Sequence, residues 1–185
     1  MRIGFDAKRY FNNSTGLGNY SRWLVQGLKH RSHENDLLLY HPKPAGLKDA
    51  TGPQTFISKL FPSLWRSSWI TRQLKRDSLD IYHGLSNELP RGIHKTSIKT
   101  VVTIHDLIQK RYPENYSAID RRIYNAKVRY AQGVADAIVV PSEQTKKDLI
   151  RYFQTAAERI HVIPLGTAPI PDHSTEKSVE EDYVL

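Results

Sequence analysis

The chain has 185 residues, which is enough for one α/β domain with a full hydrophobic core and little more. It contains no cysteine, which excludes disulfide bonds and cysteine-based zinc sites and is compatible with a reducing compartment. The formal net charge of +8 favours an anionic partner, for which nucleic acid, a phosphorylated small molecule and a membrane surface all qualify.

Short apolar runs that end in polar or turn residues recur along the chain and predict strands. Runs this short and this rich in β-branched residues are typical of strands buried on both faces of a parallel sheet. In chain order, the predicted strands are Arg2–Phe5, Asp36–Tyr40, Asp80–His83, Thr100–Ile104, Ile138–Val140 and His161–Ile163.

Helices are predicted between these strands. A loop from Asp6 to Thr15 precedes the first helix, which opens at Gly16, and Ser117 with Asp120 forms a start signal for the longest one. The predicted helices are residues 16 to about 28, Pro62–Arg76, Ser117–Asp136 and a helix beginning at Ser142. The longest helix is expected to bury Ile119, Ile123, Ala126, Tyr130 and Val134. Alternating strands and helices imply a Rossmann-like open parallel sheet flanked by helices, an α/β fold.

His105 and Asp106 follow the most regular apolar run. Ligands of open parallel sheets lie outside the carboxyl ends of the strands, so this pair is the first candidate for a site. The two side chains could transfer a proton or form a hydrogen bond to a ligand near neutral pH. Alternatively, His105 is satisfied by neighbouring backbone and Asp106 caps a turn. The residues alone leave both interpretations open.

Gly16 and Gly18 would let a phosphate approach the backbone at a helix N-terminus, although they could equally form a flexible turn. They come too late after the first strand for a nicotinamide-dinucleotide fingerprint, which we therefore disfavour. His83 is interpreted as structural in preference to functional. Ser142 is interpreted as a helix N-cap that keeps a potential ligand role. The histidines lack metal-ligand spacing, so no metal site is supported.

The stretch from Phe61 to Arg76 mixes basic and aromatic residues, and no acidic residue occurs between Ala50 and Arg76. It could make peripheral contact with an anionic membrane surface, or it could be a crossover helix that buries Trp65 and Trp69. We favour the second interpretation, since amphipathic spacing does not distinguish lipid from core. Nucleic acid is not expected as a partner, because the stretch matches no recognised nucleic-acid-binding module.

Several of these motifs, in order, resemble those of glycosyltransferase family 4. The resemblance covers nearly the whole chain and rests on Ile3–Lys8 with Thr15–Tyr20, Asp80–Gly84, Val102–Leu107, Ala137–Glu143 and Val162–Gly166. It implies a GT-B fold, in which two Rossmann-like domains face each other across a cleft. Residues 1–171 would be the N-terminal, acceptor-side domain, and residues 172–185 would be a linker and the start of a missing C-terminal donor-binding domain.

The resemblance also implies an activity. The full-length parent would be a retaining glycosyltransferase of polysaccharide biosynthesis, moving a hexose from a GDP- or UDP-linked nucleotide-sugar to a glycan or lipid-linked acceptor, with mannose as a candidate. No metal and no cofactor beyond the donor substrate is implied. The backbone at Gly16 and Gly18 would approach the donor diphosphate, and His105 would contact the transferred sugar or the acceptor hydroxyl beside Asp106. Residues that would shape the acceptor side are Lys8, Arg9, His83, Glu88 and Ser142.

One departure from the family pattern concerns catalysis. The basic pair that neutralises the leaving diphosphate and the Glu-x7-Glu segment both belong to the second domain, so we expect this chain alone to be inactive. The alternative is a standalone Rossmann-like module that binds an anionic ligand without catalysis. No apolar run reaches membrane-spanning length and no signal-peptide core fits before the first strand. We therefore expect a cytoplasmic protein, peripheral at the inner face of the membrane if the basic stretch meets lipid.

Overall fold

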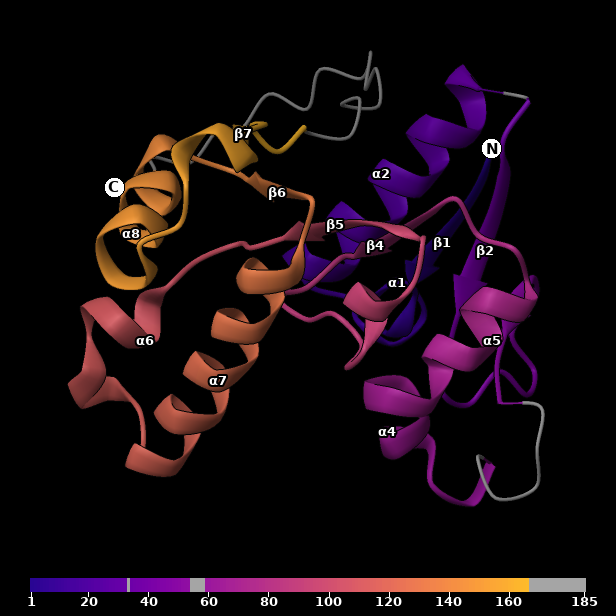
Figure 1. Ribbon diagram of the computed structural model, residues 1–185, viewed down its shortest axis with the longest axis horizontal. Helices are drawn as coiled ribbons and strands as arrows, with labels where there is room; N and C mark the ends of the chain where they lie inside the picture. The colour runs from indigo at the N-terminus through magenta and orange to yellow at the C-terminus, as the bar shows by residue number, and fades with distance from the viewer. Residues whose placement is uncertain (33, 54–58, 167–185) are drawn as a thin grey trace, which may run out of the picture.

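A seven-stranded sheet runs through the centre of the computed structural model, which describes residues 1–32, 34–53 and 59–166 (Figure 1). All the strand pairs are parallel, and the order across the sheet is β3-β2-β1-β4-β5-β6-β7. The strands are β1 (Arg2–Asp6), β2 (Asp36–Tyr40), β3 (Ala50–Thr51), β4 (Ile81–Gly84), β5 (Lys99–Thr103), β6 (Ala137–Val140) and β7 (Ile160–Val162). The expected Rossmann-like parallel sheet is confirmed.

The order of the strands reverses between β1 and β4. From β1 the chain builds β2 and β3 outward in one direction, and it then returns to lay down β4 to β7 in the other. Phe5 lies beside His83, and His83 lies beside Val101, so the carboxyl ends of the three central strands meet at one edge. A crevice at such a reversal is where open α/β sheets bind ligands.

Helices occupy the connections between the strands (Figure 1). They are α1 (Lys8–Asn12), α2 (Gly16–Arg31), α4 (Pro62–Leu64), a π-helix (Trp65–Trp69), α5 (Ile70–Arg76), α6 (Ile108–Arg111), α7 (Ala118–Val134) and α8 (Glu143–Phe153). The predicted caps are confirmed, because Ser117 Oγ accepts from the N–H of Asp120 at 3.1 Å and Ser142 Oγ accepts from that of Thr145 at 3.2 Å. The loop expected between Asp6 and Thr15 instead contains α1, which is too short to produce a helical period.

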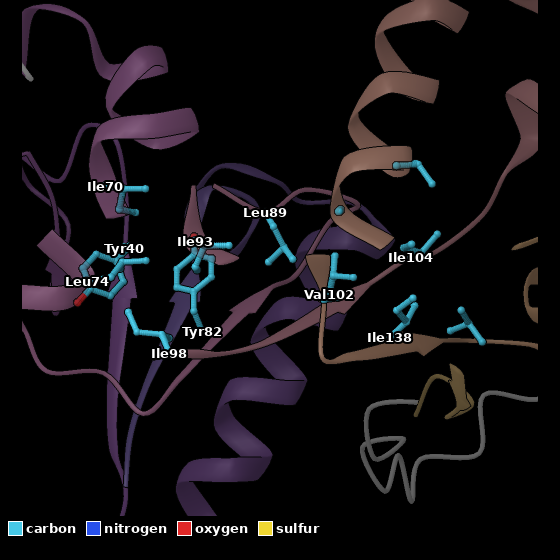
Figure 2. Close-up of a cluster of buried hydrophobic side chains, with 14 of the residues drawn as sticks. Tyr40, Ile70, Leu74, Tyr82, Leu89, Ile93, Ile98, Val102, Ile104 and Ile138 are labelled. Carbon is cyan, nitrogen blue, oxygen red and sulfur yellow. The ribbon is translucent and has the colours of Figure 1, made fainter. Parts of the chain in front are cut away.

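Two clusters of buried apolar side chains hold the helices to the sheet. The larger cluster joins β2 and β4–β6 to α5, α7 and α8, and Figure 2 labels ten of its members, from Tyr40 to Ile138. The smaller one joins β1 to α2, through Phe5 and Val25 among others. Burying a side chain of this size contributes roughly 1.5–3 kcal/mol, so both layers stabilise the central edge.

The apolar face predicted for α7 is wrong over its first half. Ile119 is 72% exposed and Ile123 is 48% exposed, and Ala126 is also exposed. Only the C-terminal half packs on the sheet, through Val128 and Ala131, while the N-terminal half extends beyond it (Figure 1). The apolar side chains of the first half therefore stand beside the carboxyl edge instead of in the core.

The stretch predicted as the helix Pro62–Arg76 is helical throughout, but its middle turn is the π-helix Trp65–Trp69. Trp65 is buried and donates Nε1–H to Gln73 Oε1 at 3.2 Å, so its predicted place in the core is confirmed. Trp69 is 39% exposed, so the same prediction was wrong for this residue. The π-helix bonds i to i+5, and this wider turn rotates residues four apart away from a common face.

The predicted domain boundary at residue 171 and the predicted linker 172–185 lie outside the described residues. None of the helices within the described ranges has both the length and the apolar character needed to cross a bilayer.

Candidate functional site

A hollow of about 280 Å³ opens at the carboxyl edge, between the π-helix and α7. Four of its five charged lining residues are joined in one network, which we call the ion network: Asp6, Arg66, Glu88 and Lys127. The fifth, Arg91, has no salt bridge within the described residues. The guanidinium of Arg66 donates hydrogen bonds to both carboxylate oxygens of Asp6, and its Nη1 donates to Glu88 Oε2 at 2.6 Å. Lys127 Nζ donates to the other oxygen of Glu88 at 2.6 Å.

In the ion network, burial and the neighbouring charges have opposite effects on the pKa values of Arg66 and Glu88. Burial alone would lower the pKa of the Arg66 guanidinium, but the charge and hydrogen bonds of Asp6, and then the charge of Glu88, raise it. Burial alone would raise the pKa of Glu88, yet Arg66 and Lys127 hold it below its usual value. Both shifts favour the charged forms of Arg66 and Glu88. Two acidic and three basic side chains line this one small hollow.

A close approach of backbone segments brings Glu88 to this hollow. A Cβ at Gly84 would lie 2.0 Å from the carbonyl oxygen of Glu88, so only glycine lets the following loop close over the end of β4. Asn87 adopts a left-handed conformation with φ of 58°, and its N–H donates to the Thr103 carbonyl at 2.9 Å. The loop is thereby fixed to the end of β5.

The same loop holds His105. The backbone N–H of His105 donates to Asn87 Oδ1 at 3.0 Å, and its Nε2 lies 2.9 Å from the Leu85 carbonyl oxygen. Because a carbonyl oxygen only accepts, Nε2 carries the proton, and in the neutral ring Nδ1 is left as an acceptor. Burial lowers the pKa of His105, which favours this neutral form, and the edge of the ring packs on Tyr20 at a centroid distance of 4.9 Å.

His83 lies deeper than His105, in a chain of hydrogen bonds. Its Nε2 is 2.9 Å from Thr103 Oγ1, which is in turn 2.8 Å from the hydroxyl of Tyr20. The side chain is 8% exposed, and burial together with the charge of His105 lowers its pKa to about 4. This environment agrees with the structural role preferred from the sequence.

The lowered pKa of His83 predicts a pH-dependent stability. The unfolded chain takes up a proton near pH 6.5 and the folded one only near pH 4, so the free energy of unfolding should fall by about 3 kcal/mol as the pH falls between these values. Urea denaturation at pH 7 and pH 4 measures the loss. His83→Gln, which does not titrate, should show a loss smaller by this amount. Equal losses in both proteins would contradict the assignment.

The N-terminus of α2 offers free backbone N–H groups. Asn13 Oδ1 accepts from the N–H groups of Thr15 and Gly18, at 2.9 and 3.1 Å, and so caps the helix in place of Thr15. A Cβ at Gly18 would lie 1.7 Å from the Asn13 carbonyl oxygen, so close packing accounts for this glycine. Gly16 is exposed with open space around it, and among the described residues its N–H has no hydrogen-bond partner.

Comparison with known proteins places the chain in a family. The sequence model of Glycosyltransferase Family 4 matches residues 14–169, which is most of the chain. The chain belongs to this family. No curated protein matches it.

A solved structure extends the comparison to the fold. The apo form of the lipopolysaccharide outer core galactosyltransferase WaaB matches with a TM-score of 0.55 at 15% identity, over 95% of this chain and 50% of the other. The family 4 chain therefore spans half the length of that galactosyltransferase. The Rossmann-like sheet of the family 4 chain corresponds to one half of a GT-B fold, as the sequence led us to expect.

Three of the residues predicted for the family 4 site meet in a second hollow, of about 180 Å³. Arg9, Glu88 and Asp106 all line it, and Asp106 is exposed while its Oδ1 accepts from the N–H of Ile108 at 3.3 Å. Lys8 lies on the exposed side of α1 and Ser142 caps α8, so neither lines the two hollows at the edge.

Four residues that build the site were not predicted from the sequence to belong to it: Asp6, Arg66, Asn87 and Lys127. Arg66 is separated from Asp6 by 60 positions, and no local pattern predicts that pairing. A signal was nevertheless present, because Asp6 ends a buried strand and a buried carboxylate needs a cation. Among the described residues, no group of three or more His, Asp or Glu side chains is placed to hold a metal ion.

Proposed function

We propose that this chain is the acceptor-side domain of a retaining glycosyltransferase, which moves a hexose from a nucleotide-sugar to a glycan or lipid-linked acceptor. The observation that carries the proposal is the ion network beside His105 at the point where the strand order reverses. Membership of glycosyltransferase family 4 supports it independently.

The lining of the larger hollow suits a sugar. Carboxylates accept hydrogen bonds from hydroxyl groups, and those of Asp6 and Glu88 are already fixed in position by Arg66. Apolar and aromatic side chains complete the walls and would pack on the C–H faces of a sugar ring: Tyr82, Leu89, Pro90, Ile123 and Tyr130. Prepositioned groups of this kind orient an acceptor hydroxyl toward a donor.

His105 would act at the reacting end of the acceptor. Its neutral ring would accept a hydrogen bond at Nδ1 from a sugar hydroxyl, with Asp106 at the rim of the neighbouring hollow. The free N–H of Gly16 at the N-terminus of a 16-residue helix would face a phosphate of the donor, since helix N-termini attract anions. Donor phosphate and reacting hydroxyl would thus meet at one edge.

The identity of the sugar and the location of the acceptor are the finer parts of the proposal. Mannose is our first candidate, and galactose, which the WaaB enzyme transfers, is the second. Exposed apolar side chains on the segment that carries Arg66 favour a lipid-linked acceptor at the cytoplasmic face of a membrane: Leu60, Phe61, Leu64 and Trp69.

The proposal is tested with a two-domain protein, in which this chain is joined to a donor-binding domain, and a panel of GDP- and UDP-hexoses. We expect transfer of one hexose with retained anomeric configuration, measured by NMR of the product, and activity that survives chelation of metals. This chain alone should transfer none, because the groups that neutralise the leaving diphosphate would lie in the other domain. Inversion at the anomeric carbon, or turnover by the isolated chain, would contradict the proposal.

A further inference from the structure

A third hollow, of about 610 Å³, lies between α6, the turn Pro113–Asn115 and the first half of α7. It shares Ala126 with the first hollow and Gln109 with the second, but no member of the ion network lines it. Its lining contains four cations and no carboxylate. The polar side chains that line it are Gln109, Lys110, Arg121, Arg122, Asn125 and Arg129. We call it the basic hollow. The family assignment and the proposed glycosyl transfer give it no role.

The cations of the basic hollow have no acidic partners. Within residues 1–32, 34–53 and 59–166, no salt bridge involves any of the four. The adjacent Arg111, by contrast, pairs with Asp148 at 3.2 Å. The acidic residues on the same elements do not compensate, because Asp120 bonds to Ser117 and Glu114 does not line the hollow. Positive charge is therefore concentrated on one concave surface.

Three polar groups in the same lining lack hydrogen bonds. Gln109 is only 5% exposed, and its side-chain amide bonds to no described residue. Arg121 Nε and Asn125 Oδ1 are both buried without a partner in the described part of the chain. Buried polar groups are normally paired, so the side chains around this hollow have hydrogen-bonding capacity that the described part of the chain does not use.

Two of the cations lie against the aromatic ring of Phe153. Lys110 Nζ lies 5.5 Å from the centroid of the ring, and the guanidinium carbon of Arg129 lies 5.8 Å from it. The aromatic ring attracts both groups, but it does not neutralise them. An anion between them would relieve their mutual repulsion.

We propose that the basic hollow binds a phosphate-bearing ligand, with a diphosphate making the fullest use of its donors. Arginine side chains bind phosphate through two parallel N–H bonds, and the hollow offers three of them with one lysine. Lipid headgroups and soluble sugar phosphates share this chemistry.

Titration of inorganic pyrophosphate into the chain, by calorimetry at about 50 mM salt, tests the proposal under weak screening. We expect Arg121→Gln with Arg129→Gln to weaken binding at least about 10-fold, the scale of losing charge-assisted hydrogen bonds. The matched control is Lys29→Gln with Arg31→Gln on the exposed face of α2, which removes the same charge and should leave the affinity within about 2-fold. Arg122→Gln, at an exposed position, repeats the test if the first pair misfolds.

A second arm identifies the source of the phosphate. Sedimentation with vesicles of phosphatidic acid in phosphatidylcholine, against phosphatidylcholine alone, should show binding that the same variants lose if the ligand is a lipid headgroup. Binding of pyrophosphate without vesicle binding would assign a soluble ligand, and both outcomes support the site. Binding of neither probe, or equal losses in the Lys29/Arg31 control, would overturn it.

Discussion

His105→Ala should lower the turnover of the two-domain enzyme about 100-fold, which is the scale of losing a positioned hydrogen-bonding or proton-transfer group. The ring of His105 is held by the Leu85 carbonyl and by Tyr20, and the hydrogen bond from Nε2 leaves Nδ1 as the acceptor. Turnover should also be constant from pH 8 to below 6.5 and fall at lower pH, because burial lowers the pKa of His105 and protonation removes the acceptor. Steady-state kinetics across pH measures both effects.

The matched control is His161→Ala, because His161 is an exposed histidine on β7, the outermost strand of the sheet, which β6 separates from β5. Gly16→Val should instead raise the KM for the donor, since the added side chain would obstruct a phosphate at the helix N-terminus. Circular dichroism verifies that each variant is folded. Near-normal turnover of a folded His105→Ala enzyme would remove His105 from the mechanism and leave it a structural residue satisfied by Leu85.

Arg66→Met should lower the free energy of unfolding by about 3–5 kcal/mol, the usual effect of removing one partner from a buried ion pair. Methionine retains most of the side-chain volume but leaves Asp6 without its cation, in a site where the carboxylate is almost wholly buried. Urea denaturation of the isolated chain at pH 7 measures the change. In the variant, Lys127 would still neutralise Glu88, because it contacts that carboxylate, but it would not replace the cation beside Asp6.

Arg72→Met provides the control for this experiment. Arg72 is exposed on α5, close to Arg66 in sequence, and it should change the free energy of unfolding by about 0.5 kcal/mol or less. A loss below about 1 kcal/mol for Arg66→Met would show that the ion network is solvated and contributes little to the fold.

The strands could be predicted from the sequence because each is a continuous apolar run that is buried on both faces. Asp36–Tyr40 has the predicted bounds, and the strand expected at Thr100–Ile104 is displaced by one residue. The two-residue β3 leaves no such pattern. The apolar face of α7 was wrong because spacing within a helix does not state how much of the helix the sheet covers.

The candidate site was predictable in position but not in its pairings. His105 and Asp106 follow a strand and were singled out by that rule, and Glu88 was expected only from the family resemblance. Arg66, by contrast, comes from a π-helix whose wider turn no periodicity anticipates. The bond between His105 N–H and Asn87 Oδ1 spans 18 positions and depends on the left-handed conformation of Asn87. Such contacts are set by tertiary structure, so residues that act in pairs are harder to find than residues that end strands.

The central position of β1 has a consequence for synthesis of the chain. Ile3 pairs with Ile81, and the bond between the Arg2 N–H and Asp80 spans 78 positions. At about 5–20 residues per second, a ribosome needs roughly 4–16 seconds to add that span, during which one edge of β1 has no partner. The first strand to leave the ribosome thus keeps one edge unpaired until β4 has been made, and chaperones that shield strand edges should affect the yield of this domain more than its final stability.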